Sequence, residues 1–161
     1  MLDYLLVIIP IFISCVAIGI TISISKKQNK IELFNVRYKC ISQIESILSF
    51  SKCIEDCKNS QIIITVFDSI WGTDGTNLSF EEKLVVYRCK LEFIKFDVSS
   101  AKLVFKHKFH TDPFDLVFSL HELLMVLIKG EDVEPYVYDL NNKCNLFYEK
   151  DFQKIVDITK I

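Results

Sequence analysis

The chain has 161 residues, half of them hydrophobic, and its 19 basic and 21 acidic side chains give a formal net charge of −2. This balance excludes the clustered Lys and Arg that phosphate recognition requires, so nucleic acid is not an expected partner. The four Gly residues are too few and too dispersed to build a phosphate-cradling loop, which argues against a nucleotide-binding fold.

The first element is an uncharged run from Tyr4 to Ile24, followed by Lys26, Lys27 and Lys30. As a helix, the run would be about 31 Å long, which matches the roughly 30 Å hydrocarbon core of a bilayer. The run therefore predicts a transmembrane anchor over residues 1–25. About 137 residues follow it, enough for one further domain, which we expect over residues 26–161.

Three other interpretations of the run fit less well. A cleaved signal peptide needs basic residues upstream and an Ala-x-Ala-like site, but Asp3 is the one charged residue upstream and no such site follows. Phe12–Cys15 is similar to a lipoprotein cleavage site but lacks the preceding basic segment. A core helix would show a polar face, which this run does not have.

The lysines behind the run also predict its orientation, because Lys and Arg accumulate on the cytoplasmic side of membrane helices. We expect a single-pass protein of the inner, cytoplasmic membrane, with its N-terminus outside and its C-terminal domain in the cytosol. That domain holds five of the six cysteines, an odd number that fits free thiols in a reducing compartment. Cys53 and Cys57 are four residues apart, and we interpret them as ordinary thiols.

Small residues recur within the anchor at Cys15, Gly19 and Ser23, so they share one helical face. Small residues let membrane helices approach closely, which predicts a helix-packing face. The alternative is chance, because small residues are common in membrane helices.

The next elements are predicted to be helices joined by a loop. Residues 30–50 contain neither Gly nor Pro, and their apolar residues recur every three or four positions, which predicts a long amphipathic helix. Ile62–Phe67 is rich in β-branched residues and could be a strand. A lone strand would have no partner, however, and we expect a short helix there. Trp71–Asn77, with two Gly residues, is expected to be a loop.

The clearest periodicity runs from Phe80 to Phe105. Apolar residues there alternate steps of four and three, the spacing of a helix that packs on a partner helix. They are Phe80, Leu84, Tyr87, Leu91, Ile94, Val98, Ala101 and Phe105. Ser79 and Glu82 form a capping-box signature. The Ser-Ser pair at 99–100 is expected to bend the helix without breaking the apolar stripe.

Helix-start and helix-stop signals bound a further helix at Pro113–Lys129. A polar connection at Glu131–Pro135, a short strand or turn at Tyr136–Tyr138 and a last helix at Leu146–Thr159 follow. We therefore predict an all-α fold, with an N-terminal transmembrane helix and an antiparallel bundle of about four helices.

Two short motifs accompany this order of elements. Ile31–Tyr38 contains Leu-Phe-x-x-Arg just after the anchor, and a later helix has Phe96 and the run Ala101–Phe105. The chain thereby resembles small single-pass bacterial membrane proteins of unknown function. Those proteins often have an aromatic residue four positions after the Arg, where this chain has Ile41. The resemblance implies the architecture and no activity.

Three histidines are the candidates for a metal site. His107 and His110 are three residues apart, His121 follows on the next predicted helix, and imidazole is a common zinc ligand. A zinc-protease helix requires His-Glu-x-x-His, but Met125 stands where the second His belongs. We therefore expect surface histidines and predict no metal, cofactor or catalytic residue.

Trp71 is a candidate partner contact, because a large aromatic residue on a loop can anchor a protein. Its alternative is to fold back onto the bundle. With no catalytic motif, the expected function is a membrane-tethered, non-catalytic interaction or scaffold protein, with the lipid bilayer and a protein or second copy as partners. The alternatives are a metal- or thiol-dependent membrane-anchored enzyme and a self-associating membrane effector.

Overall fold

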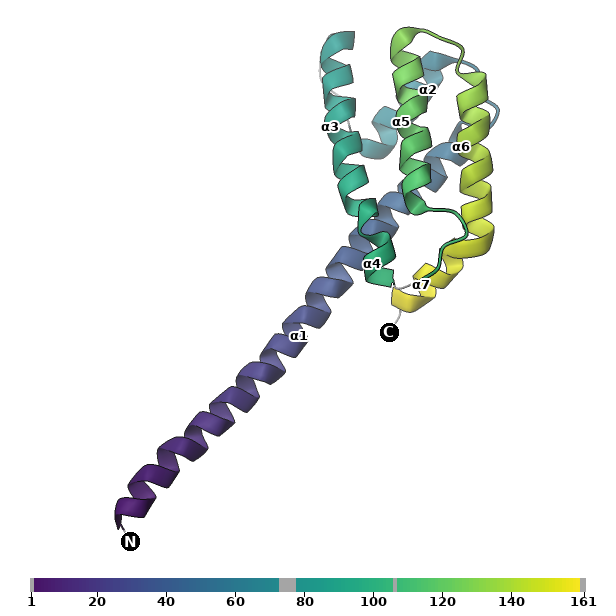
Figure 1. Ribbon diagram of the computed structural model, residues 1–161. Coiled ribbons are helices and arrows are strands. Elements are labelled where there is room, and N and C mark those ends of the chain that lie inside the picture. The colour runs from purple at the N-terminus through teal and green to yellow at the C-terminus, as the bar shows by residue number, and fades with distance from the viewer. Residues whose placement is uncertain (1, 73–77, 106, 160–161) are drawn as a thin grey trace. The chain divides into compact units, whose positions relative to one another are not determined.

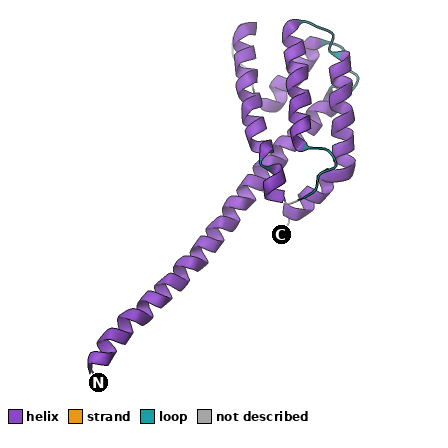
Figure 2. Cartoon of the chain, viewed as in Figure 1, coloured by secondary structure: helices purple, strands orange, loops and turns teal. Residues whose placement is uncertain are grey.

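The computed structural model describes residues 2–72, 78–105 and 107–159, and every regular element within these ranges is a helix (Figure 2). The chain divides into two units, Met1–Asn35 and Val36–Ile161, and each is described by itself. The first unit is the leading part of helix α1, which spans Leu2–Cys53. The second unit holds the rest of α1 and all later helices.

The predicted transmembrane helix is wrong. Among the described residues, no helix combines the length and the apolar composition that a membrane crossing requires. The uncharged run Tyr4–Ile24 is not a separate element, because α1 continues without a break through Lys26, Lys27 and Lys30. The single-pass topology and the inner-membrane location depended on that helix, so both predictions are wrong as well.

Helix α2, Ser60–Trp71, contains the segment Ile62–Phe67, which is therefore helical and not a strand. The Asn59 side chain caps α2 by accepting the Gln61 N–H at 2.9 Å. Ile63 and Phe67 lie one turn apart and are fully buried. Packing of this face outweighs the local β preference of the branched residues. Residues 73–77 of the predicted loop lie outside the described residues.

The predicted long helix is divided into α3, Phe80–Ser99, and α4, Ala101–Phe105. The capping box is confirmed, with the Ser79 N–H donating to Glu82 Oε2 at 2.8 Å. The break falls at the Ser-Ser pair, whose hydroxyls donate to carbonyls one turn back, a contact that competes with regular helix bonding. The predicted stripe remains buried on both sides of the break, at Tyr87, Leu91, Ile94, Val98, Ala101 and Phe105.

Helix α5 spans Pro113–Lys129, as predicted, with Asp112 capping its start and Gly130 ending it in the left-handed conformation. Helix α6 spans Glu134–Phe147, so the predicted strand or turn at Tyr136–Tyr138 and the predicted helix start at Leu146 are both wrong. Pro135 lies in the first turn of α6, where its missing N–H costs no hydrogen bond. It therefore begins a helix and does not interrupt one.

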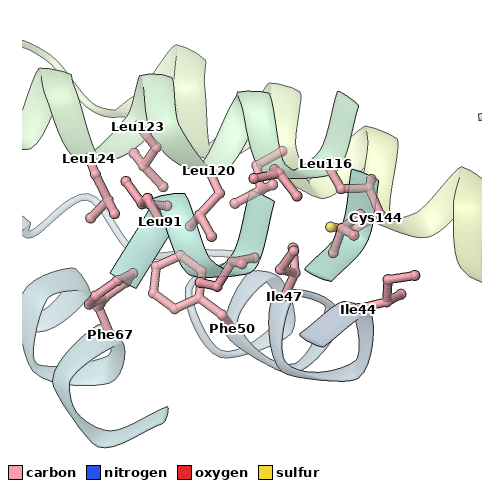
Figure 3. Close-up of a cluster of buried hydrophobic side chains, with 14 of the residues drawn as sticks. Ile44, Ile47, Phe50, Phe67, Leu91, Leu116, Leu120, Leu123, Leu124 and Cys144 are labelled. Carbon is pink, nitrogen blue, oxygen red and sulfur yellow. The ribbon is translucent and has the colours of Figure 1, made fainter. Parts of the chain in front are cut away.

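The chain continues from α6 into a π-helical turn, Tyr148–Phe152, and then into α7, Gln153–Thr159. Within the unit Val36–Ile161, α5 lies between α3 and α6 and runs antiparallel to both (Figure 1). Side chains from these helices meet the C-terminal part of α1 and α2 in one apolar core (Figure 3). Its largest fully buried members are Ile44, Ile47, Phe50, Ile54, Ile63, Phe67, Ile94, Leu116, Leu120, Leu123, Leu124 and Phe147.

Shortening Leu120 tests this core. Because Leu120 is fully buried, Leu120→Ala is expected to lower the free energy of unfolding by about 2–5 kcal/mol through lost transfer energy and a residual cavity. Ile62→Ala is the matched control, since Ile62 is 51% exposed and its truncation should change stability by less than about 1 kcal/mol. Urea unfolding followed by circular dichroism measures both, and equal losses would contradict the described core.

Candidate functional site

Two of the three candidate histidines meet at a buried carboxylate. Asp151 Oδ1 lies 3.1 Å from His107 Nε2 and 3.0 Å from His110 Nδ1. The histidines lie on the connection between α4 and α5, whereas Asp151 lies on the π-helical turn after α6. Side chains more than 40 residues apart in sequence are thereby brought together, which no spacing rule could have found.

Asp151 also binds the backbone of the same connection. Its carboxylate is fully buried and accepts the His110 N–H at 3.0 Å and the Thr111 N–H at 3.1 Å. Burial alone raises the pKa of Asp151, but the hydrogen bonds from His110, Thr111 and His107 outweigh it, so that this pKa lies below its ordinary value of 3.8. The charged form of Asp151 therefore holds the α4–α5 connection against the π-helical turn.

His121 does not join this pair. It lies on α5 and lines a different recess, together with Leu91, Glu92 and Phe118. Among the residues that the structure describes, no group of three or more His, Cys, Asp or Glu side chains is arranged to hold a metal ion. His107 and His110 converge on Oδ1 of Asp151, and we call these three residues, with the backbone N–H groups that Asp151 binds, the clasp.

The described cysteines, at positions 40, 53, 57, 89 and 144, are all free thiols. Burial raises the pKa of Cys40 to about 12, with a smaller contribution from Asp97, and burial raises that of Cys144 to about 11 against an opposing hydrogen bond from Ser51. Thiols of such high pKa are protonated at neutral pH and are poor nucleophiles. Cys40 and Cys144 therefore serve as core residues.

Trp71 is the last residue of α2, and its ring packs on the core. Its ring centroid lies 5.4 Å from that of Phe50 and 4.5 Å from that of Phe67. The indole Nε1 is buried and has no hydrogen-bond partner among the described residues. This is the folded-back arrangement that the sequence left open, and a role for Trp71 in binding a partner stays a prediction.

The small-residue face predicted at Cys15, Gly19 and Ser23 lies in α1, within the unit Met1–Asn35. A Cβ atom added at Gly19 would meet nothing within 4 Å, and Ser23 is exposed. The side chain of Cys15 lies outside the described residues. Helix packing through this face stays a prediction.

Sequence reasoning missed an exposed apolar face on α3 and α4, which we call the outer stripe. Its members are Val85, Cys89, Phe93, Phe96 and Leu103. Phe93 is 69% exposed, Phe96 is 77% exposed and Leu103 is 79% exposed. Cys89, Phe96 and Leu103 follow one another at intervals of seven residues, and this spacing is the sequence signal that could have revealed the exposed face. The buried stripe is longer and unbroken, and only that stripe was predicted.

On α3, the outer stripe lies opposite the buried stripe. At 100° per residue, Phe96 and Cys89 point about 180° away from the buried positions Tyr87 and Val98. A shallow groove of about 610 Å³ follows the outer stripe, lined by Arg88, Cys89, Glu92, Phe93 and Phe96. Helix α3 thus has two apolar faces, and the bundle covers one of them.

Comparisons of the chain with protein-family models, with curated proteins and with solved structures gave no match. The resemblance to small single-pass bacterial membrane proteins stays a prediction. The membrane helix that the resemblance implies is not found among the described residues. The outer stripe is therefore described from the exposure of its own side chains, and the clasp at Asp151 from its own hydrogen bonds.

The clasp can be tested with Asp151→Asn, because an amide cannot replace a carboxylate that accepts two backbone N–H groups. The variant is expected to lose about 2–4 kcal/mol of unfolding free energy at neutral pH. The matched control is Asp139→Asn, since Asp139 is a partly exposed partner of Lys143 and its loss should cost less than about 1 kcal/mol. Urea unfolding compares the two, and equal costs would contradict the clasp.

Stability should also depend on pH through Asp151. Because its folded-state pKa lies below 3.8, the ionised group stabilises the fold above the unfolded-state pKa, and this contribution is lost as the pH falls through the folded-state value. The stability difference between wild type and Asp151→Asn should therefore narrow as the pH falls from neutrality to below the ordinary Asp value of 3.8. A difference that stays constant over this range would show that the carboxylate charge plays no part.

Trp71 gives a further test of the core. Trp71→Phe is expected to stay within about 1 kcal/mol of wild type, because the smaller ring keeps its contacts and an unpaired buried N–H is removed. Trp71→Ala should lose about 3–5 kcal/mol. Thermal unfolding followed by circular dichroism separates the outcomes, and a large loss in Trp71→Phe would mean that Nε1 has a partner.

Proposed function

We propose that this chain is a non-catalytic interaction protein whose contact surface is the outer stripe. The observation that carries this proposal is the exposure of two phenylalanine rings, Phe93 and Phe96, on a helix that is otherwise packed into a folded bundle. Apolar surface in water is costly, and a rigid aromatic pair within a charged rim is typical of binding surfaces.

The size of the outer stripe supports the same function. A phenylalanine offers ~150–250 Å² of surface, and with the exposed parts of Val85 and Leu103 the stripe presents on the order of 500 Å² of apolar area. This area falls in the range of the largest apolar patch on a typical monomer, which is often functional. Scattered surface hydrophobic residues, by contrast, would not align along one helix.

The shape of the outer stripe favours a helical partner. From Val85 to Phe96 it extends about 16 Å along α3, and Leu103 on α4 continues the seven-residue spacing of Cys89 and Phe96. A line of this kind matches the apolar face of another amphipathic helix, which places its own side chains between those of the stripe. The partner chemistry that we infer is therefore an amphipathic helix with an apolar seam.

The test is the binding of a synthetic amphipathic peptide of roughly 21 residues, with Leu at the a and d positions of three heptads. Fluorescence anisotropy of the labelled peptide is expected to show saturable binding to the full chain. Phe96→Glu should weaken binding by at least roughly tenfold, because a charge would be buried at the centre of the contact.

Tyr138→Glu is the matched control, because it adds the same charge at a residue that is 69% exposed on α6, away from the outer stripe. It should bind the peptide as wild type does. A second peptide, with the same composition but scrambled heptads, should not bind. No binding by wild type, or equal binding by Phe96→Glu, would overturn the proposed function.

A further inference from the structure

We propose that the helix that covers the outer stripe belongs to a second copy of this chain, with the two α3 helices antiparallel and centred between Ile94 and Lys95. This inference rests on the proposed function of the outer stripe. It concerns a closed two-fold dimer, in which residue i of one copy faces residue j of the other, and residue j faces residue i.

The apolar residues fit this arrangement because their spacing is the same in both directions. Phe93 of one copy faces Phe96 of the other, and the two-fold axis repeats the pair. The same register places Cys89 opposite Ser100 and, beyond it, Leu103 of α4 opposite Val86, which is half-buried beside the outer stripe. The aromatic centre is therefore flanked by one small polar layer on each side of the axis.

The charged residues beside the outer stripe also favour the antiparallel orientation. In an antiparallel pair, the same flank of each helix meets its own copy, so Lys90 of one chain approaches Asp97 of the other, twice. Opposite signs therefore meet twice on this flank, which stabilises the pairing and its register.

A parallel pair would bring like charges together. In parallel coiled coils, a residue on one flank faces the residue five positions later on the partner, which here joins Glu92 to Asp97. Glu92 contacts Lys95 of its own chain at 3.8 Å, an exposed pair that is screened by water, and Asp97 has no ion-pair partner among the described residues. Repulsion therefore disfavours the parallel dimer.

The test uses two variants of the full chain, Lys90→Glu and Asp97→Lys, each made with two different affinity tags. Either variant alone brings like charges together twice, so co-purification of its two tagged forms should fall by roughly tenfold relative to wild type. Lys90→Glu mixed with Asp97→Lys restores both attractive pairs, and co-purification should return. Association through α1 would leave all the combinations equal, which would overturn the inference.

A cross-link provides a second test that does not alter the charges. Ser100→Cys should form a disulfide with native Cys89 of the other copy under mild oxidation, and peptide mass spectrometry can map it. The same two positions within one chain lie about 16 Å apart along the helix and cannot join. A Cys89–Cys89 disulfide between copies would indicate a parallel pair and overturn the inference.

The two proposals can fail separately. Lys90→Glu keeps the outer stripe but disfavours the dimer, so it should still bind the amphipathic peptide. If the variant binds the peptide while wild-type copies neither co-purify nor cross-link, the second copy is excluded and the proposed function stands. If neither the peptide nor a second copy binds, both proposals are overturned.

Discussion

Burial of α5 on two sides is the constraint on which the unit Val36–Ile161 depends. Nine of its side chains are buried, and the helix contacts α3 on one side and α6 on the other. A helix whose apolar face is this wide needs a neighbour on more than one side. The buried stripe from Tyr87 to Phe105 is the face of α3 and α4 that covers one side of α5. Contact with α5 therefore decides how these two helices are turned.

That orientation leaves the second apolar face of α3 outside the bundle. The residues that make it up are no less hydrophobic than those of the buried stripe, and a further helix of the same chain could in principle have covered them. The helices that follow α5 lie elsewhere, because α6 packs on α5 and continues through the π-helical turn, which carries Asp151, into α7.

Local signals predicted the elements that local chemistry controls. The capping box at Ser79 and the Pro and Gly at the two ends of α5 satisfy backbone groups within a few residues, so their outcome does not depend on distant contacts. The predictions failed where the local sequence is compatible with two different structures. Pro135 can end a helix or begin one, and the uncharged run at Tyr4–Ile24 was interpreted as an element of its own although α1 continues through the lysines.

The sequence by itself determined that the domain is helical, where α3 and α5 begin, and which residues form the buried stripe of α3, because periodicity and capping act over one or two turns. Only the tertiary structure decided that His107 and His110 meet at Asp151, that Trp71 packs on Phe50 and Phe67, and that Phe93 and Phe96 remain exposed. These outcomes depend on which elements come into contact across long stretches of chain. Spacing along the sequence carries no information about such contacts until the core is assembled.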